Sequence, residues 1–167
     1  SFSATYKYAL LLALSDYAVE KGDDSGLPVQ ITTKDLADKF IEYYWRQVVP
    51  YLPQSNNNEP SILKQNHGKQ AAIIPIIQQT HSAYEGSLCQ ARQNRYDWTR
   101  LAQKVADKIA EMPLWKLQVV GASADPFLYE QAGQGRTINI LPGVLFNFRK
   151  FHNLIRNLVI GAWTTSI

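Results

Sequence analysis

The sequence predicts an α+β fold: a single, mostly helical domain with a small three-stranded antiparallel sheet. A length of 167 residues suffices for one domain with a hydrophobic core and is short for two. Apolar residues make up 46% of the chain and charged residues 19%, a balance typical of globular proteins rather than disordered chains. Apolar residues recur with helical spacing over most of the chain, and short extended segments become frequent only after Pro113.

Five helical regions follow from this spacing. In chain order they cover Thr5–Glu20, Thr32–Val48, Ser61–Gln79, residues 97–112 and residues 142–163. Thr32 and Asp35 have the spacing of a capping box at the start of the second region. Gly68 and Pro75 interrupt the third region, which is therefore one broken helix or two short ones. Residues 80–96 have weak periodicity and are expected to form a loop or a poor helix.

The sheet is expected from three short extended segments near the C-terminal end. They are Trp115–Val120, Phe127–Glu130 and Arg136–Ile140, and small and polar turn residues separate them. Residues 133–135, Gly-Gln-Gly, lack the third glycine of a dinucleotide-binding fingerprint and are interpreted as a turn. Another short extended segment is expected at residues 29–31.

The last helical region is expected to be continuous and cut short. Pro142 suits its first turn, and an apolar stripe runs from Leu145 to Trp163. The sequence stops four residues after Trp163 without a cap or a polar tail. We therefore expect residues 1–167 to form one accessory domain, truncated in its C-terminal helix, with further protein beyond Ile167.

Composition narrows the class of protein. The longest apolar run, Ala9–Leu14, has six residues, whereas a membrane span needs about 20. No segment has the order of regions found in a signal peptide. The single cysteine, Cys89, excludes an internal disulfide and a cysteine-based zinc cluster. We expect a cytoplasmic protein that does not enter a membrane.

No complete active site is apparent. The histidines His67, His81 and His152 lack metal-ligand spacing, and neither a phosphate-binding glycine loop nor a serine nucleophile elbow is present. Cys89 with His67 or His81 as its base is one interpretation, and a partly buried thiol without a catalytic role is the simpler one. We therefore expect no catalytic residue, no metal ligand and no cofactor in this chain, with His152 a hydrogen-bonded core residue.

Charge is distributed unevenly along the chain. Residues 1–60 carry five basic against eight acidic side chains, whereas residues 61–112 and 113–167 each carry a net charge of +3. From Gln131 to Ile167 there are four basic residues and no acidic one. This bias permits contact with nucleic acid or an acidic partner without requiring it.

Three stretches carry candidate nucleic-acid contacts. Aromatic rings beside Arg46, in residues 43–47, could stack on bases, or the two tyrosines and Trp45 could pack inward. Residues 63–70 combine amide, imidazole and ammonium groups around a turn, which suits a phosphate or a solvated polar turn. Residues 149–156 place basic side chains away from the apolar stripe, where Arg149 and Arg156 would share a face, which suits two phosphate contacts or an ordinary solvated face. The predicted contact residues are Arg46, Lys64, Asn66, His67, Lys69, Arg149, Lys150 and Arg156.

Several segments resemble one protein family. They are residues 6–11, the stretch 35–47 with its Tyr-Tyr-Trp-Arg-Gln string, residues 63–66, residues 113–118, and residues 148–155 continuing through Ala162-Trp163. In these blocks the chain is similar to the N-terminal region of certain bacterial proteins with an HNH endonuclease domain. The Tyr-Tyr-Trp-Arg-Gln string is the most specific part of the resemblance.

The resemblance implies an accessory role. In such proteins the metal-dependent nuclease module follows this region and uses histidines and a divalent cation. This chain contains no His-Asn-His constellation, so the resemblance assigns no catalytic residue to it. It implies an accessory region of a DNA-cleaving protein of bacterial defence or restriction, which positions substrate DNA, recognises a partner or holds the nuclease inactive. Among these roles we expect DNA binding or substrate positioning, with DNA as the partner.

A second interpretation assigns a different class of function. The chain could be a protein-interaction or dimerisation module without DNA contact. Its apolar face would then be the end of the last helix, from Leu158 to Ile167, or the region around Trp45.

Overall fold

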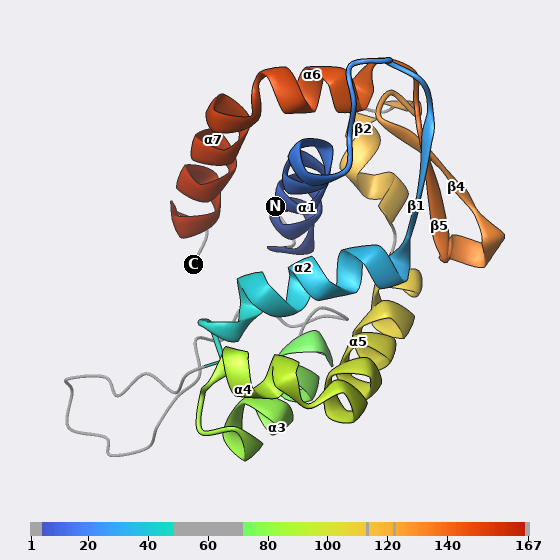
Figure 1. Cartoon of the computed structure of the whole chain (residues 1–167). Coiled ribbons are helices and arrows are strands. Elements are labelled where there is room, and N and C mark those ends of the chain that lie inside the picture. The colour runs from blue at the N-terminus through green and yellow to red at the C-terminus, as the bar shows by residue number, and fades with distance from the viewer. Residues whose placement is uncertain (1–4, 49–71, 113, 122, 166–167) are drawn as a thin grey trace.

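The computed structural model describes residues 5–48, 72–112, 114–121 and 123–165. Helices dominate these residues (Figure 1). The α-helices are α1 Thr5–Glu20, α2 Thr33–Trp45, α3 Ile73–Ala83, α4 Leu88–Gln93, α5 Arg95–Ala110, α6 Val144–Lys150 and α7 His152–Thr165. A three-stranded antiparallel sheet completes the fold, so the predicted mostly helical α+β fold is confirmed.

The sheet consists of β1 (Val29–Thr32), β5 (Thr137–Ile140) and β4 (Tyr129–Ala132), in that order. Ile138 lies opposite Ile31 on one side and Gln131 on the other. β4 and β5 form the predicted hairpin, and residues 133–135 form its turn. The third strand is the short extended segment near the N-terminus, which the sequence did not assign to the sheet.

Residues 115–120 do not form the predicted strand. Leu114–Gln118 is a 3₁₀ helix, and only Val119–Val120 (β2) is extended, paired with Ser123–Ala124 (β3). The buried Gln118 side chain lies beside β4 instead: its Oε1 accepts from Leu128 N at 2.8 Å and its Nε2 donates to Tyr129 O at 2.8 Å. One side-chain amide thus supplies the hydrogen bonds of a neighbouring strand.

The helices near the middle of the chain differ from expectation at their ends. The segment of weak periodicity contains α4, which Ser87 caps by accepting a hydrogen bond from Gln90 N. α5 begins at Arg95, because Asn94 rather than Asp97 is its N-cap. Pro75 lies in the first turn of α3, where a missing N–H costs nothing, and therefore does not interrupt that helix. Residues 61–71 of the predicted third region lie outside the described part of the chain.

The last helical region is not continuous. It begins at Val144, after Gly143 with φ 76°, and it breaks at Phe151 into α6 and α7. Both pieces contact α1, and Figure 1 shows them bent around it. The break removes the straight helix on which Arg149 and Arg156 were expected to share a face.

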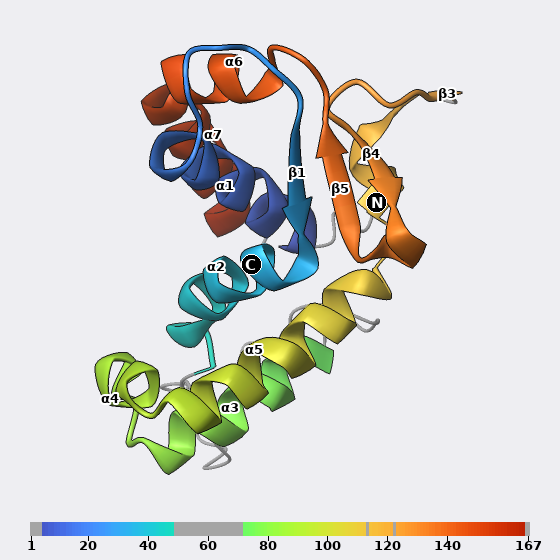
Figure 2. The same cartoon turned by 45° about the vertical axis from the view of Figure 1, so that its right-hand side comes forward.

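α1 lies at the centre of the hydrophobic core. Leu10, Ala13 and Leu14 are completely buried, since α6 and α7 cover one side of the helix and α2 packs on another. α2 in turn contacts α5, which carries α3 and α4 on its remaining surface (Figure 2). The predicted capping box at the start of α2 is present: the side chain of Thr32 accepts from Asp35 N, and the Asp35 carboxylate accepts from Thr32 N.

Candidate functional site

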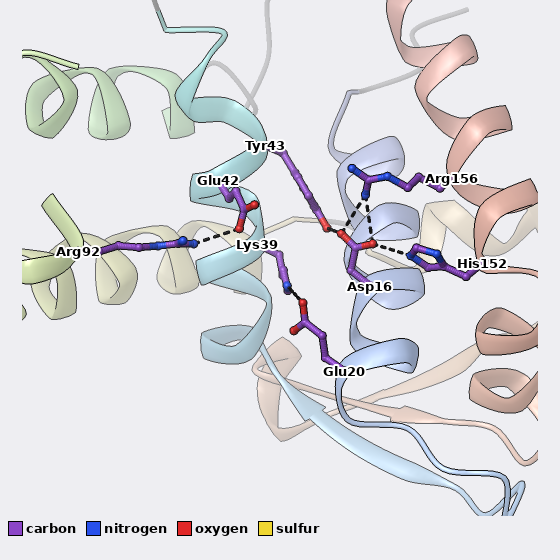
Figure 3. Close-up of polar contacts among 8 residues, drawn as sticks. All are labelled: Asp16, Glu20, Lys39, Glu42, Tyr43, Arg92, His152 and Arg156. Carbon is purple, nitrogen blue, oxygen red and sulfur yellow. Dashed lines mark hydrogen bonds and ion pairs between the residues drawn. The ribbon is translucent and has the colours of Figure 1, made fainter. Parts of the chain in front are cut away.

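Asp16 is the centre of a polar cluster that joins three helices (Figure 3). Its side chain on α1 is 16% exposed. The Tyr43 hydroxyl on α2 donates to Oδ2 at 2.6 Å, and His152 Nε2 on α7 lies 2.8 Å from Oδ1. Arg156, one turn further along α7, donates from one nitrogen to both oxygens at 3.2 Å. One carboxylate therefore ties α1 to α2 and α7.

These contacts determine the ionisation of Asp16. Burial alone would raise the pKa of this carboxyl group. Hydrogen bonds from Tyr43 and His152, together with the charges of Arg156 and Lys39, outweigh burial and hold the pKa below its ordinary value of 3.8. An ionised carboxylate only accepts, so the His152 nitrogen that faces it carries a proton.

Tyr43 is held as a neutral donor. Burial and the hydrogen bond to Asp16 raise the pKa of its hydroxyl far above the ordinary value of 10.0. The cluster thus has a proton donor, an anion, an imidazole and a guanidinium in fixed positions. It is suited to holding helices in register, and Arg156 opposes binding of a metal ion at Asp16 by charge repulsion. Within the described ranges no group of three His, Cys, Asp or Glu side chains could hold a metal ion.

Two further ion pairs flank this cluster. Lys39 on α2 pairs with Glu20 at the end of α1, and Arg92 on α4 pairs with Glu42 on α2 at 3.0 Å (Figure 3). With neighbouring side chains these four residues line a hollow of about 260 Å³. The hollow is bordered by charges of both signs, and the ion pairs reinforce the attachment of α2 to the helices beside it.

The sequence-predicted contact residues have different environments. Arg46 is exposed at the C-terminal cap of α2. Arg149 and Lys150 are exposed at the end of α6; Arg149 pairs with Asp24 at 2.8 Å, and the Lys150 ammonium lies 5.5 Å from the Phe151 ring centre. Arg156 is engaged by Asp16. The remaining four, Lys64, Asn66, His67 and Lys69, lie outside the described residues.

The aromatic string on α2 packs inward rather than facing solvent. Tyr44 is buried and its hydroxyl lies 3.0 Å from that of Thr5. Trp45 is also buried; its Nε1 donates to Gly86 O at 2.8 Å, and its ring centre lies 5.1 Å from that of His81. Trp45 is therefore neither a stacking platform for bases nor an exposed interaction face, and only Arg46 of this string remains for a partner.

Among the described residues, no contact joins a histidine to Cys89, the candidate nucleophile. Cys89 is exposed on α4, and its described hydrogen-bond partner is Gln93, whose Nε2 lies 3.7 Å from Sγ. His81 packs against Trp45 instead. His67 lies outside the described residues.

A family model described as "Domain of unknown function (DUF8808)" matches residues 1–167. The chain belongs to this family. No curated protein and no solved structure matches the chain. In the part of this DUF8808 domain that the structure describes, no helix is both long and apolar enough to cross a membrane.

Sequence reasoning missed Asp16, which binds three side chains from two other helices of this DUF8808 domain. The sequence feature that could have revealed it is an acidic residue on a predicted helix whose other positions are mostly apolar. Its partners could not be found by spacing, because Tyr43, His152 and Arg156 lie 27, 136 and 140 positions away. His152 was expected to be hydrogen-bonded in the core, and it is partly buried and bound to Asp16.

Proposed function

We propose that this chain is the DNA-binding or substrate-positioning region of a metal-dependent HNH-type endonuclease of bacterial restriction or defence. The nuclease module, with its divalent metal, would lie elsewhere in the protein. The blocks of sequence that resemble the N-terminal regions of such proteins support this proposal, as does the basic bias after Gln131. We place the protein in the cytoplasm, where bacterial DNA is accessible.

The exposed pair Arg149 and Lys150 carries the proposal. Arg149 is 41% exposed and its partner Asp24 is 78% exposed. Exposed ion pairs of this kind contribute about 1 kcal/mol or less, so a DNA phosphate can replace Asp24 at little cost. The Arg guanidinium then binds a phosphate through two parallel hydrogen bonds, and Lys150 beside it binds as a point charge.

Arg156 takes a different part in this proposal. Its bonds to Asp16 make it a positioning residue, since together with His152 it fixes α7 on α1. α6 contacts both α1 and α7, so the two basic residues at its end stand on a supported helix. A rigid support favours binding because little conformational entropy is lost when DNA is bound.

Fluorescence anisotropy with a labelled DNA duplex of about 25 base pairs tests the proposal at several salt concentrations. We expect the affinity of the whole chain to fall steeply with salt, because bound phosphates release counterions. The double variant Arg149→Gln/Lys150→Gln should bind more weakly. The slope of log affinity against log salt should fall in magnitude by about one to two units, because one or two phosphate contacts are lost.

The matched control is Lys21→Gln/Lys34→Gln. It removes the same charge from the α1 and α2 region, and neither lysine forms an ion pair within the described ranges. Equal loss of affinity in both double variants would contradict a specific role for α6. No binding by the wild-type chain at low salt would refute the proposal as a whole.

Self-association is a second candidate function, and one observation favours it. Leu154 and Leu158 on α7 are 59% and 64% exposed, and Phe151 before them is 46% exposed. Their spacing puts the three on one helical face. Residues 157–165 contain no charged side chain, so charge repulsion along this stretch would not oppose the approach of a second copy.

Sedimentation velocity over a range of protein concentrations tests this candidate. A dimer that is insensitive to salt, and that Leu154→Ser/Leu158→Ser abolishes while the circular dichroism spectrum is unchanged, would favour self-association. A monomer at all concentrations would reject it. The exposed Val19→Ser serves as the control, since it removes an exposed apolar side chain elsewhere.

A further inference from the structure

A groove of about 170 Å³ lies between α3 and α5. These two helices lie side by side in Figure 2. The polar lining of the groove consists of Gln79, Thr80, Tyr84, Asp97, Arg100 and Lys104. On each helix the lining positions follow the spacing of one face, so the groove is formed where two helical faces meet. Leu101 on α5 is buried beneath it and contributes to the apolar floor with Ile76.

Within the described residues, the two cations of this groove form no ion pair. Arg100 and Lys104 are separated by one turn of α5 and both side chains are exposed. In the described ranges neither forms an ion pair, whereas Arg92, Lys108 and Arg136 do. Like charges one turn apart destabilise a helix slightly, so an anion bound between them would relieve this repulsion.

The acidic residue of the groove is already occupied. The Tyr84 hydroxyl donates to Asp97 Oδ2, and this contact together with burial raises the pKa of Tyr84. Asp97 lies in the first turn of α5, one turn before Arg100. The groove thus contains two cations and one carboxylate, which leaves it with a net positive charge. The carboxylate already accepts a hydrogen bond from Tyr84.

The remaining polar groups suit an oxyanion. Thr80 offers a hydroxyl donor and Gln79 an amide donor across the groove from the two cations. A phosphate group accepts from all of these, and Arg100 can bind it through two hydrogen bonds at once. The volume is below the roughly 300–1,000 Å³ of sites for drug-sized ligands, so one small charged group fits best.

We propose that the α3–α5 groove binds a phosphate group through Arg100 and Lys104. Two sources supply this chemistry: the backbone of a nucleic acid and a free phosphate or mononucleotide. The site uses no residue of the α6 surface. Only the nucleic-acid source rests on the proposed function, and the two can therefore fail separately.

The first arm of the test uses inorganic phosphate and the whole chain labelled with ¹⁵N. Phosphate is titrated at constant ionic strength with chloride as the balancing anion, and amide shifts are followed by NMR. We expect the amides of Arg100, Lys104 and Thr80 to shift with a Kd of about 1 mM, since the ligand is small and solvated. The double variant Arg100→Gln/Lys104→Gln should show none of these shifts.

The second arm uses the same labelled duplex of about 25 base pairs as above. Its matched control is Lys34→Gln/Arg95→Gln, which also removes two positive charges. One of these two residues, Arg95, lies in the first turn of α5. A loss of DNA affinity of about 10-fold or more in Arg100→Gln/Lys104→Gln, but not in the control, identifies the nucleic-acid backbone as the source. Unchanged DNA affinity together with the phosphate shifts identifies a free phosphate or mononucleotide.

Two results would overturn the proposal. One is the absence of phosphate shifts in the wild-type chain together with equal DNA affinity of the groove variant and its control. The other is a set of phosphate shifts that persists unchanged in Arg100→Gln/Lys104→Gln. The Arg149→Gln/Lys150→Gln variant should keep the phosphate shifts. The phosphate test therefore remains valid even if Arg149 and Lys150 do not bind DNA.

Discussion

The His152 imidazole lies 2.8 Å from the Asp16 carboxylate, although 136 positions separate the two residues in the chain. Together with Arg156, this contact fastens the last described helix to the first one. The Asp16 side chain is 16% exposed and has therefore lost most of its hydration. Its ionic and hydrogen-bonded partners compensate for this loss. The contact therefore contributes to stability in a way that an exposed ion pair would not.

Asp16→Asn is expected to destabilise the fold by about 2–4 kcal/mol, because Arg156 and His152 lose a charged acceptor. Urea denaturation at neutral pH measures the change. Asp24→Asn is the control: it removes a carboxylate from the exposed pair with Arg149 and should change the free energy of unfolding by less than about 1 kcal/mol. Equal effects of the two substitutions would contradict the role given to Asp16.

The contribution of Asp16 to stability should depend on pH in a defined direction. The folded-state pKa of its carboxyl group lies below the ordinary 3.8, so folding favours the ionised form. Its stabilisation is fully present above pH 4 or so and is lost as the pH falls through the folded-state pKa. The difference in unfolding free energy between the wild type and Asp16→Asn should therefore narrow in acid, and a constant difference would argue against this linkage.

Gln118→Leu should cost about 2–4 kcal/mol, because it leaves backbone groups of residues 127–129 without their hydrogen-bond partner. Gln118→Glu keeps the acceptor and loses the donor, and we expect an intermediate loss. Thermal denaturation followed by circular dichroism ranks the stabilities of the wild type, Gln118→Glu and Gln118→Leu. Gln131→Leu, at an exposed position of β4, is the control and should lie within about 0.5 kcal/mol of the wild type.

Trp45→Phe separates a structural role from a nucleic-acid role of the α2 aromatic string. Loss of the hydrogen bond to Gly86 O and of part of the buried ring should lower stability by about 1–3 kcal/mol. DNA affinity should not change. Weaker DNA binding with unchanged stability would show that this ring contacts bases, contrary to its burial.

Local features of the fold could be predicted from the sequence. The first helix, the Thr32–Asp35 capping box and the β4–β5 hairpin depend on residues close together in the chain, and each was found. The strand at residues 29–32 was not assigned to the sheet, because its partner β5 lies over 100 positions further on. The 3₁₀ helix before β2 has strand-like composition, and only the contact of Gln118 with β4 reveals why it is not a strand.

The candidate sites were harder to predict than the fold. Basic residues were chosen by their charge, and no sequence pattern distinguished Arg156, which binds Asp16, from Arg149, which pairs with an exposed carboxylate. Arg100 and Lys104 were passed over because α5 was described by its apolar face alone. Whether a cation is paired depends on which helices pack together, and spacing along one helix does not contain that information.

The central position of α1 has a consequence for how the protein is made. The helices that cover one of its sides, α6 and α7, are synthesised more than 120 residues after it. Until then Leu10 and Leu14 lack part of their cover, and Asp16 lacks the partners that α7 brings. The nascent chain must therefore keep an apolar helix from aggregating until these two helices have been synthesised, a task for which ribosome-associated chaperones are suited.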